Sequence, residues 1–234
     1  SFLSPMTFIL PSFGASAIAA VPGGGGGGGF SNTYSVDFDG SNDYIQTSYA
    51  PASSSGFTIS FWMKSSNTSS SLGFVSNGTS AGNPGGFQVL SPSGTKAFYV
   101  LVANSSGSTS VNNNVGGSNS TLDVRDGEWH HIAATISGTS VKIYKDGGDA
   151  AINSGNPSNT QGTPFATWTS AVAYTGNTGN PYYFGRNGAY PGYLYQGLLD
   201  EVALFETELT GSNISAIYNG GNGPADISSL SPLG

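Results

Sequence analysis

The stretch "DGEWHHIAATISGTSVKIYKDGG" (residues 126–148) predicts a β-hairpin. After a turn and the large side chain of Trp129, every second residue from Ile132 to Ile136 is apolar, as in a strand with one buried face. The "SGTS" segment then reverses the chain into "VKIY", in which alternate residues are again apolar. We expect this hairpin to lie in the core of a β-sheet.

The same alternation recurs along most of the chain. The segment "FTISFWM" (57–63) puts four apolar side chains on one face and Thr58, Ser60 and Trp62 on the other. Further strands are predicted at "YSVDF", "AFYVLVA", "YYFG" and "LDEVALF", with Gly-, Asn- and Ser-rich turn clusters between them. Many short strands at this spacing predict an all-β fold, an antiparallel two-sheet sandwich or jelly roll.

One short C-terminal helix is predicted at "TGSNISAIYNGG". Thr210 is the expected N-cap, Ile214 and Ile217 share one face, and Gly220 lies near the expected C-cap. The polar stretches 104–120 and 153–180 are predicted to be loops, since Asn, Ser, Gly and Thr dominate them.

The composition excludes two kinds of partner. Charged residues make up only 8% of the 234 residues, so Ser, Thr, Asn and Gly must supply much of the surface. With a formal net charge of −7 and six Lys plus Arg, the chain lacks a basic surface for nucleic acid. No apolar run approaches the roughly 18 residues of a membrane-spanning helix, and no cysteine is present.

Residues 1–22 are predicted to be an extended apolar N-terminal arm that docks on other copies of the protein or on other proteins of an assembly. Pro5 and Pro11 interrupt the arm, and it has no Lys or Arg, so we expect it to be retained rather than cleaved as a signal peptide. The alternative is that the arm folds back onto its own domain. Its apolar side chains are Phe2, Leu3, Met6, Phe8, Ile9, Leu10 and Phe13.

Seven consecutive glycines follow the arm. Because glycine loses more conformational freedom on ordering than any other residue, we expect this segment to be a flexible linker between the arm and the rest. The predicted organisation is therefore an arm (1–22), a polyglycine linker (23–33), a jelly roll (34–221) and a C-terminal tail (222–234).

Three segments resemble laminin-G-like, concanavalin-A-like jelly-roll domains. They are "VDFDGSNDYI" (36–45), the hairpin at 126–148 and "YQGLLDEVALFETELTGSNISAIYNGG" (195–221), and they occur in the order of that family. The resemblance covers roughly residues 34–221. It implies two packed antiparallel sheets, one of them curved, and very often carbohydrate or protein binding at a rim or on the concave face.

A calcium ion is the one cofactor that the sequence suggests. Asp39, Asn42 and Asp43 place three oxygen-bearing side chains on one turn, which is the kind of ligand that calcium takes. The resemblance implies that Asp200 and Glu201 of the closing strand lie nearby. The alternative is that Asp39 only caps its own turn by accepting backbone hydrogen bonds.

No catalytic site is predicted. His130 and His131 are adjacent in a strand, so they point to opposite faces, and the resemblance assigns them to the structural pattern of the hairpin. Related glucanases carry a closely spaced Glu-x-Asp-x-Glu run, whereas in "LDEVALFETE" Asp200 and Glu201 are neighbours and Glu206 and Glu208 lie beyond the strand. We therefore expect the protein not to be an enzyme.

The segment 165–195 is rich in aromatic residues and is the predicted binding region. Tyr182, Phe184 and Tyr195 are assigned to the core by alternation. The ligand-binding candidates, which are expected in turns or between the aromatic residues, are Trp168, Tyr174, Arg186, Asn187, Tyr190 and Tyr193. Such residues suit stacking on sugars and protein interfaces equally well, so both alternatives stay open.

An apolar arm, a polyglycine spacer and a lectin-like sandwich together resemble a virion surface protein: a capsid decoration, tail fibre or appendage subunit of a tailed phage. The expectation is a non-enzymatic structural protein at the virion surface that contacts other copies, other virion proteins and cell-surface glycans, with avidity from many copies. The alternatives are a secreted, extracellular or cell-surface carbohydrate-binding module and a glucanase-type glycosidase.

Overall fold

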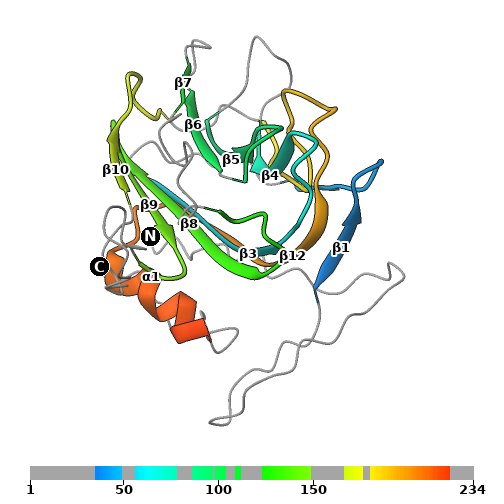
Figure 1. Ribbon diagram of the computed structural model, residues 1–234. Helices are drawn as coiled ribbons and strands as arrows, with labels where there is room; N and C mark the ends of the chain where they lie inside the picture. The colour runs from blue at the N-terminus through cyan, green and yellow to red at the C-terminus, as the bar shows by residue number, and fades with distance from the viewer. Residues whose placement is uncertain are drawn as a thin grey trace.

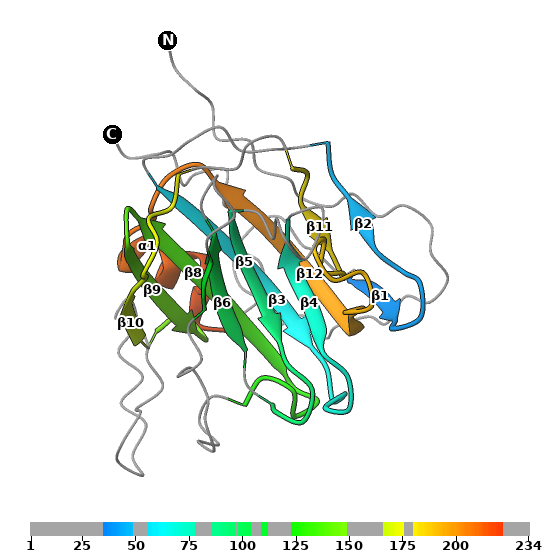
Figure 2. The same ribbon diagram turned by 90° about the horizontal axis from the view of Figure 1, so that it is seen from above.

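The computed structural model describes residues 35–48, 56–77, 86–96, 98–103, 109–111, 123–148, 166–175 and 180–221. The predicted arm, linker and C-terminal tail lie outside the described residues. Within them the chain forms two antiparallel β-sheets that pack face to face, with one short helix (Figures 1 and 2). The all-β sandwich that the sequence predicts is confirmed.

The first sheet, here called sheet A, contains the hairpin at 126–148 as two neighbouring strands. Its spatial order is β1 (Val36–Asp39), β12 (Gln196–Phe205), β3 (Phe57–Lys64), β8 (Trp129–Ser137), β9 (Ser140–Lys145) and β10 (Ala166–Thr169). Ile132 lies opposite Phe61 and Ala134 opposite Ile59, so the alternating apolar residues of both strands face the interior together. Figure 1 shows this sheet curving beneath the other one.

The second sheet, sheet B, is built from shorter strands. Its order is β2 (Ile45–Gln46), β11 (Tyr183–Phe184), β4 (Leu72–Ser76), β5 (Phe87–Ser91), β6 (Tyr99–Ala103) and β7 (Thr109–Val111). The inner faces of both sheets share one apolar core, in which Phe57, Phe61 and Phe74 are fully buried.

Two strands lie inside stretches predicted to be loops. β7 is within 104–120, where it pairs with β6, and β10 is within 153–180, where it pairs with β9. β7 and β10 each pair with a strand that would otherwise have one unpaired edge. This pairing depends on the tertiary fold, so a polar composition does not reveal it. The prediction of uninterrupted loops there is wrong.

The helix α1 (Gly211–Tyr218) covers the outer face of sheet A, on the side away from sheet B (Figure 1). Thr210 is its N-cap, as predicted, and forms a capping box with Asn213. Ile214 and Ile217 are buried in a second apolar cluster against sheet A. Asn219 is the C-cap, in the left-handed conformation, and Gly220 follows it directly, near the cap as predicted.

A buried cation stabilises the loops at one end of the sandwich. Arg125 is 1% exposed and donates hydrogen bonds to the carbonyls of Asn67, Ser70 and Pro92 and to the hydroxyl of Ser91. Burial lowers the pKa of this guanidinium to about 10, so it stays charged at neutral pH.

No helix of the described residues has the length and apolarity needed to span a membrane.

Candidate functional site

The β11 strand carries Tyr183 on the outer surface of the sandwich. Phe184 of the same strand lies opposite Ile45 and Val75 and faces the core, so its neighbour Tyr183 points the other way. The Arg186 guanidinium lies 5.1 Å from the centroid of the Tyr183 ring and 4.5 Å from that of the Tyr44 ring. Tyr44 is 43% exposed.

The loop that follows carries two further aromatic rings. Tyr190 and Tyr193 stack with centroids 5.3 Å apart and ring planes at 22°. Tyr190 is 40% exposed, and the N–H of Tyr193 donates to its carbonyl at 2.9 Å, which closes a turn. Arg186 and Leu194 form a β-bridge, so Arg186 and both rings belong to one loop. We call Tyr44, Tyr183, Arg186, Tyr190 and Tyr193 the aromatic patch.

The loop of the aromatic patch is held rigidly against sheet B. A Cβ atom on Gly73 would lie 2.3 Å from the backbone nitrogen of Asn187, so only glycine allows the loop to approach β4 so closely. The hydroxyl of Ser76 donates to the Arg186 carbonyl at 2.7 Å and accepts from the Gly188 N–H at 3.0 Å. The rings are therefore displayed by a preorganised loop, which reduces the entropic cost of binding.

The aromatic patch can recognise a ligand with both apolar and polar faces. Tyrosine rings offer a flat apolar surface with a hydroxyl at one end, and the guanidinium donates hydrogen bonds from a planar group. A pyranose ring, with a C–H face and hydroxyls at its rim, fits this combination. No residue of the aromatic patch has a carboxylate or thiol that could act as a nucleophile or general base.

Of four predicted binding residues, three lie in the aromatic patch and one, Trp168, lies elsewhere. Tyr190 and Tyr193 stack on each other, and Arg186 of the same loop lies over Tyr44, so all three belong to the aromatic patch. Trp168 was predicted in a turn, but it lies in β10, half-buried and packed against the main core. Its pairing with Val141 of β9 explains the difference, because it places the ring on the edge of sheet A.

Two other predicted binding residues are buried and do not face a ligand. Tyr174 is 2% exposed, and its ring centroid lies 5.9 Å from that of Phe57, within the main core. Burial raises the pKa of its hydroxyl. Asn187 is 1% exposed, and its Oδ1 accepts from the N–H groups of Ala189 and Tyr190, at 2.9 and 3.0 Å. Both predictions are corrected: Tyr174 packs the core, and Asn187 shapes the loop.

Tyr44 and Tyr183 were not among the predicted binding residues. For Tyr183 a signal existed, because it lies between two residues assigned to the core, Tyr182 and Phe184, and alternation therefore turns it outward. For Tyr44 no local signal existed. It joins the aromatic patch only because β2 pairs with β11. The paired residues Gln46 and Tyr183 are 137 residues apart in the sequence.

Of the four predicted calcium ligands, Asp39, Asn42 and Asp43 share one turn and Asp200 lies apart from them. Asp39 accepts from the N–H of Ser41 at 2.7 Å, and Asp43 accepts from that of Asp39 at 3.3 Å, so both carboxylates serve their own turn. Asn42 is exposed on the same turn. Asp39 lies opposite Gln196 in the ladder of β1 and β12, which puts Asp200 about 13 Å away along the strand.

The predicted set of four ligands therefore does not fit one calcium ion. More generally, no group of three or more His, Cys, Asp or Glu side chains in the described parts of the chain is arranged to hold a metal.

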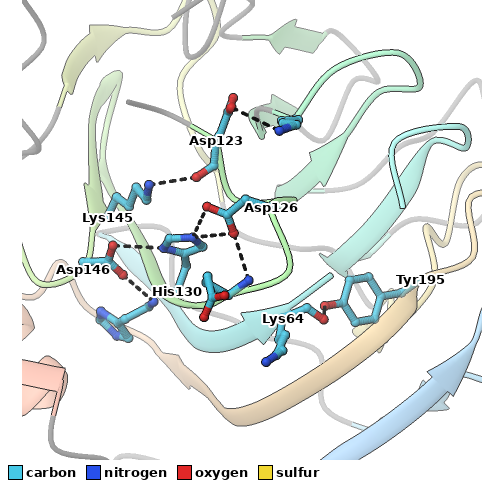
Figure 3. A network of polar contacts seen from close by, with 10 residues as sticks. Lys64, Asp123, Asp126, His130, Lys145, Asp146 and Tyr195 are labelled. Carbon is cyan, nitrogen blue, oxygen red and sulfur yellow. Dashed lines mark hydrogen bonds and ion pairs between the residues drawn. The ribbon is translucent and has the colours of Figure 1, made fainter. Parts of the chain in front are cut away.

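The two histidines point to opposite faces, as predicted. His130 lies between two carboxylates, with Nδ1 3.0 Å from Asp146 and Nε2 3.1 Å from Asp126 (Figure 3). His131 is fully buried on the other face, where its Nε2 lies 2.9 Å from the hydroxyl of Ser60. Desolvation lowers the pKa of His131 to about 4, against a smaller opposing effect of Asp146. The His130 ring therefore links the start of β8 to the end of β9, and the His131 ring links β8 to β3.

A carboxylate in this network is also perturbed. Burial alone would raise the pKa of Asp126, but the hydrogen bond from the N–H of Glu128 and the contact with His130 together lower it. The carboxylates of Asp126 and Asp146 are both engaged by His130, which stabilises the start of β8 and the end of β9.

Comparison with known families and structures agrees with this fold. The family model described as "Concanavalin A-like lectin/glucanases superfamily" matches residues 39–215. The search of curated proteins finds no match.

Among solved structures, the binding domain of Paraclostridial Mosquitocidal Protein 1 has a TM-score of 0.59 at 16% identity, covering 88% of this chain and 46% of that one. The SAP-like pentraxin of Limulus polyphemus has a TM-score of 0.52 at 13% identity, covering 82% and 85%. The botulinum neurotoxin serotype D ligand binding domain, in complex with N-acetylneuraminic acid, has a TM-score of 0.53 at 12% identity, covering 92% and 46%. At such identities the likeness shows the fold alone, and this chain spans less than half of the first and third.

Proposed function

Since the chain belongs to the concanavalin A-like lectin/glucanases superfamily, we propose that it is a non-enzymatic carbohydrate-binding module whose aromatic patch stacks on a saccharide. The observation that carries the proposal is the exposed Tyr190 ring, stacked on Tyr193 in a loop whose first residue, Arg186, is itself packed on Tyr44. A structural neighbour of the same fold, the neurotoxin serotype D domain, is a complex with a sugar, N-acetylneuraminic acid.

The geometry of the rings favours a sugar over a protein partner. Tyr44 and Tyr190 are the exposed large hydrophobic side chains of the described surface, and the Arg186 guanidinium lies over the rings of Tyr44 and Tyr183 rather than beside an acid. A stable protein interface needs roughly 800 Å² per partner with a buried apolar centre, whereas a few rings suffice for a saccharide. Weak binding per site is expected, with avidity from several copies.

The absence of catalysis is part of the proposal. Asp200 and Glu201 are neighbours at a bulge of β12, where Glu201 has a positive φ of 49°, and Glu208 is paired with Lys142 at 2.7 Å. Asp126 and Asp146 are engaged by His130. These contacts leave no arrangement that we can assign to a general acid with a partner carboxylate among the described residues. A reducing-sugar assay on the bound saccharide tests this. Release of reducing sugar by the protein would refute the non-enzymatic proposal.

A glycan array tests the binding itself. We expect specific hits that are lost in Tyr190→Ala and Arg186→Ala, because each substitution removes a stacking or donor surface. Tyr190→Phe keeps the ring and should retain most of the signal. Thr167→Ala changes an exposed residue of β10 and is the control. Equal binding by the wild type and Tyr190→Ala would contradict the proposal.

The finer expectation, a virion surface protein such as a capsid decoration or tail fibre subunit, rests on the sequence of residues 1–33. We propose it as the setting of the module: the apolar arm grips an assembly and the glycines let the sandwich stand apart. Deleting residues 1–22 should abolish assembly and leave saccharide binding intact. Normal incorporation without the arm would refute this setting and favour a secreted or cell-surface module.

A further inference from the structure

A polar hollow of about 520 Å³ opens where β3 ends and β12 begins. Its walls are residues 64–69, Gly127 and residues 196–198. This volume is in the range of small-molecule sites, about 300–1,000 Å³. None of the residues of the aromatic patch lines the hollow, so it is a separate feature of the surface.

The hollow carries one positive charge and no negative one. Among the described residues that line it, Lys64 is the only charged one. In the described chain, Lys96 is paired with Asp123 and Lys142 with Glu208, whereas no carboxylate forms an ion pair with Lys64. Figure 3 shows its backbone carbonyl accepting from Tyr195, while its ammonium takes part in none of the interactions drawn. An unpaired ammonium in a protein of net charge −7 is a ready partner for an anionic group.

Uncharged polar residues share the lining of the hollow with Lys64. The hydroxyls of Ser66 and Thr68 make no hydrogen bond with other described residues. The Nδ2 of Asn67 donates to Oε1 of Gln196 at 2.8 Å, which fixes that amide and leaves its Nε2 protons for another acceptor. These hydroxyl and amide groups can form hydrogen bonds with the hydroxyls of a sugar.

The loop that forms one wall is fixed in advance. Arg125, buried beneath it, donates to the carbonyls of Asn67 and Ser70. The N–H of Gly94 donates to the Thr68 carbonyl at 2.7 Å. A wall that is already ordered costs little conformational entropy on binding, which distinguishes the hollow from a loose surface loop.

We propose that this hollow is a second binding site, specific for an acidic saccharide whose carboxylate pairs with Lys64 and whose hydroxyls bond Ser66, Thr68 and Gln196. The proposal rests on the hollow alone and does not depend on saccharide binding at the aromatic patch.

Calorimetric titration of the full chain with trigalacturonate and, in parallel, with neutral galactotriose tests it. We expect trigalacturonate to bind at least tenfold more tightly, since a hydrogen bond to a charged group contributes on the order of 1.5–3 kcal/mol. Lys64→Met keeps the aliphatic stem and should reduce that affinity about tenfold, whereas Lys64→Arg should retain it. Lys96→Met makes the same change at an exposed lysine outside the hollow and should have no effect.

Three outcomes would overturn the proposal: equal affinity for the acidic and neutral trisaccharides, no binding of trigalacturonate, or unchanged binding by Lys64→Met. Tyr190→Ala separates the two sites. If it abolishes trigalacturonate binding while Lys64→Met does not, the acidic sugar binds at the aromatic patch, and the inference fails while the proposed function stands.

Discussion

Replacing His131 by Gln should remove a large part of the stability that the fold loses between pH 7.5 and 5. The imidazole is fully buried between β3 and α1, where its ring centroid lies 5.4 Å from that of Trp62 and 5.9 Å from that of Tyr218. Burial lowers its pKa to about 4, from 6.5 in the unfolded chain. The unfolded chain therefore binds a proton that the folded protein does not, and stability is lost as the pH falls from about 6.5 towards 4.

The size of this effect follows from the two pKa values. At pH 5 the unfolded state is almost fully protonated at this residue and the folded state is mostly neutral, so linkage gives a loss of about 2 kcal/mol relative to pH 7.5. By pH 4 the loss reaches about 3 kcal/mol. Glutamine cannot be protonated in this range and can still donate to the hydroxyl of Ser60.

Urea unfolding at pH 7.5, 6 and 5, followed by tryptophan fluorescence, measures it. The free energy of unfolding of His131→Gln should fall by about 2 kcal/mol less than that of the wild type between pH 7.5 and 5. His130→Gln is the matched control, because it also removes one imidazole but on the opposite face of β8. Parallel pH profiles of the wild type and His131→Gln would refute the reasoning.

Three further predictions concern stability and the display of the aromatic patch. Arg125→Met should lower the free energy of unfolding by about 3 kcal/mol or more, since it leaves several buried acceptors without a donor; denaturant unfolding that shows a change under 1 kcal/mol would contradict this. Gly73→Ala should destabilise by about 2 kcal/mol, because its Cβ would overlap the backbone of Asn187, and should also reduce saccharide binding; unimpaired binding would show that the loop tolerates displacement. Thr210→Ala should lower the thermal midpoint through loss of about 1 kcal/mol of capping, whereas Thr210→Ser should not, and equal midpoints would argue against the cap.

The strands with one buried face could be predicted from the sequence, because alternation is a local property. The interior positions of β3 and β8 were read directly from apolar residues at every second place, and Phe57 and Ile132 are indeed fully buried. β4 was missed because all five of its residues are buried, so it shows no alternation. β2 and β7 are too short to show a period and exist through pairing with neighbours.

The candidate site was only partly predictable, since exposure is a tertiary property. The rule that aromatic residues in turns face solvent succeeded for Tyr190 and failed for Tyr174, which the fold turns inward against Phe57 and Phe87. Tyr44 and Arg186 are far apart in sequence, and only strand pairing brings the ring beneath the guanidinium.

The central claim is that the aromatic patch is the saccharide-binding surface. The most direct test is an NMR titration of the isotope-labelled full chain with the best neutral saccharide from the array. The account predicts that the largest shifts fall on the amides of Tyr44, Tyr183, Arg186 and the Tyr190–Tyr193 turn. Shifts confined to residues outside these segments, with the amides of the turn unmoved at saturation, would contradict it.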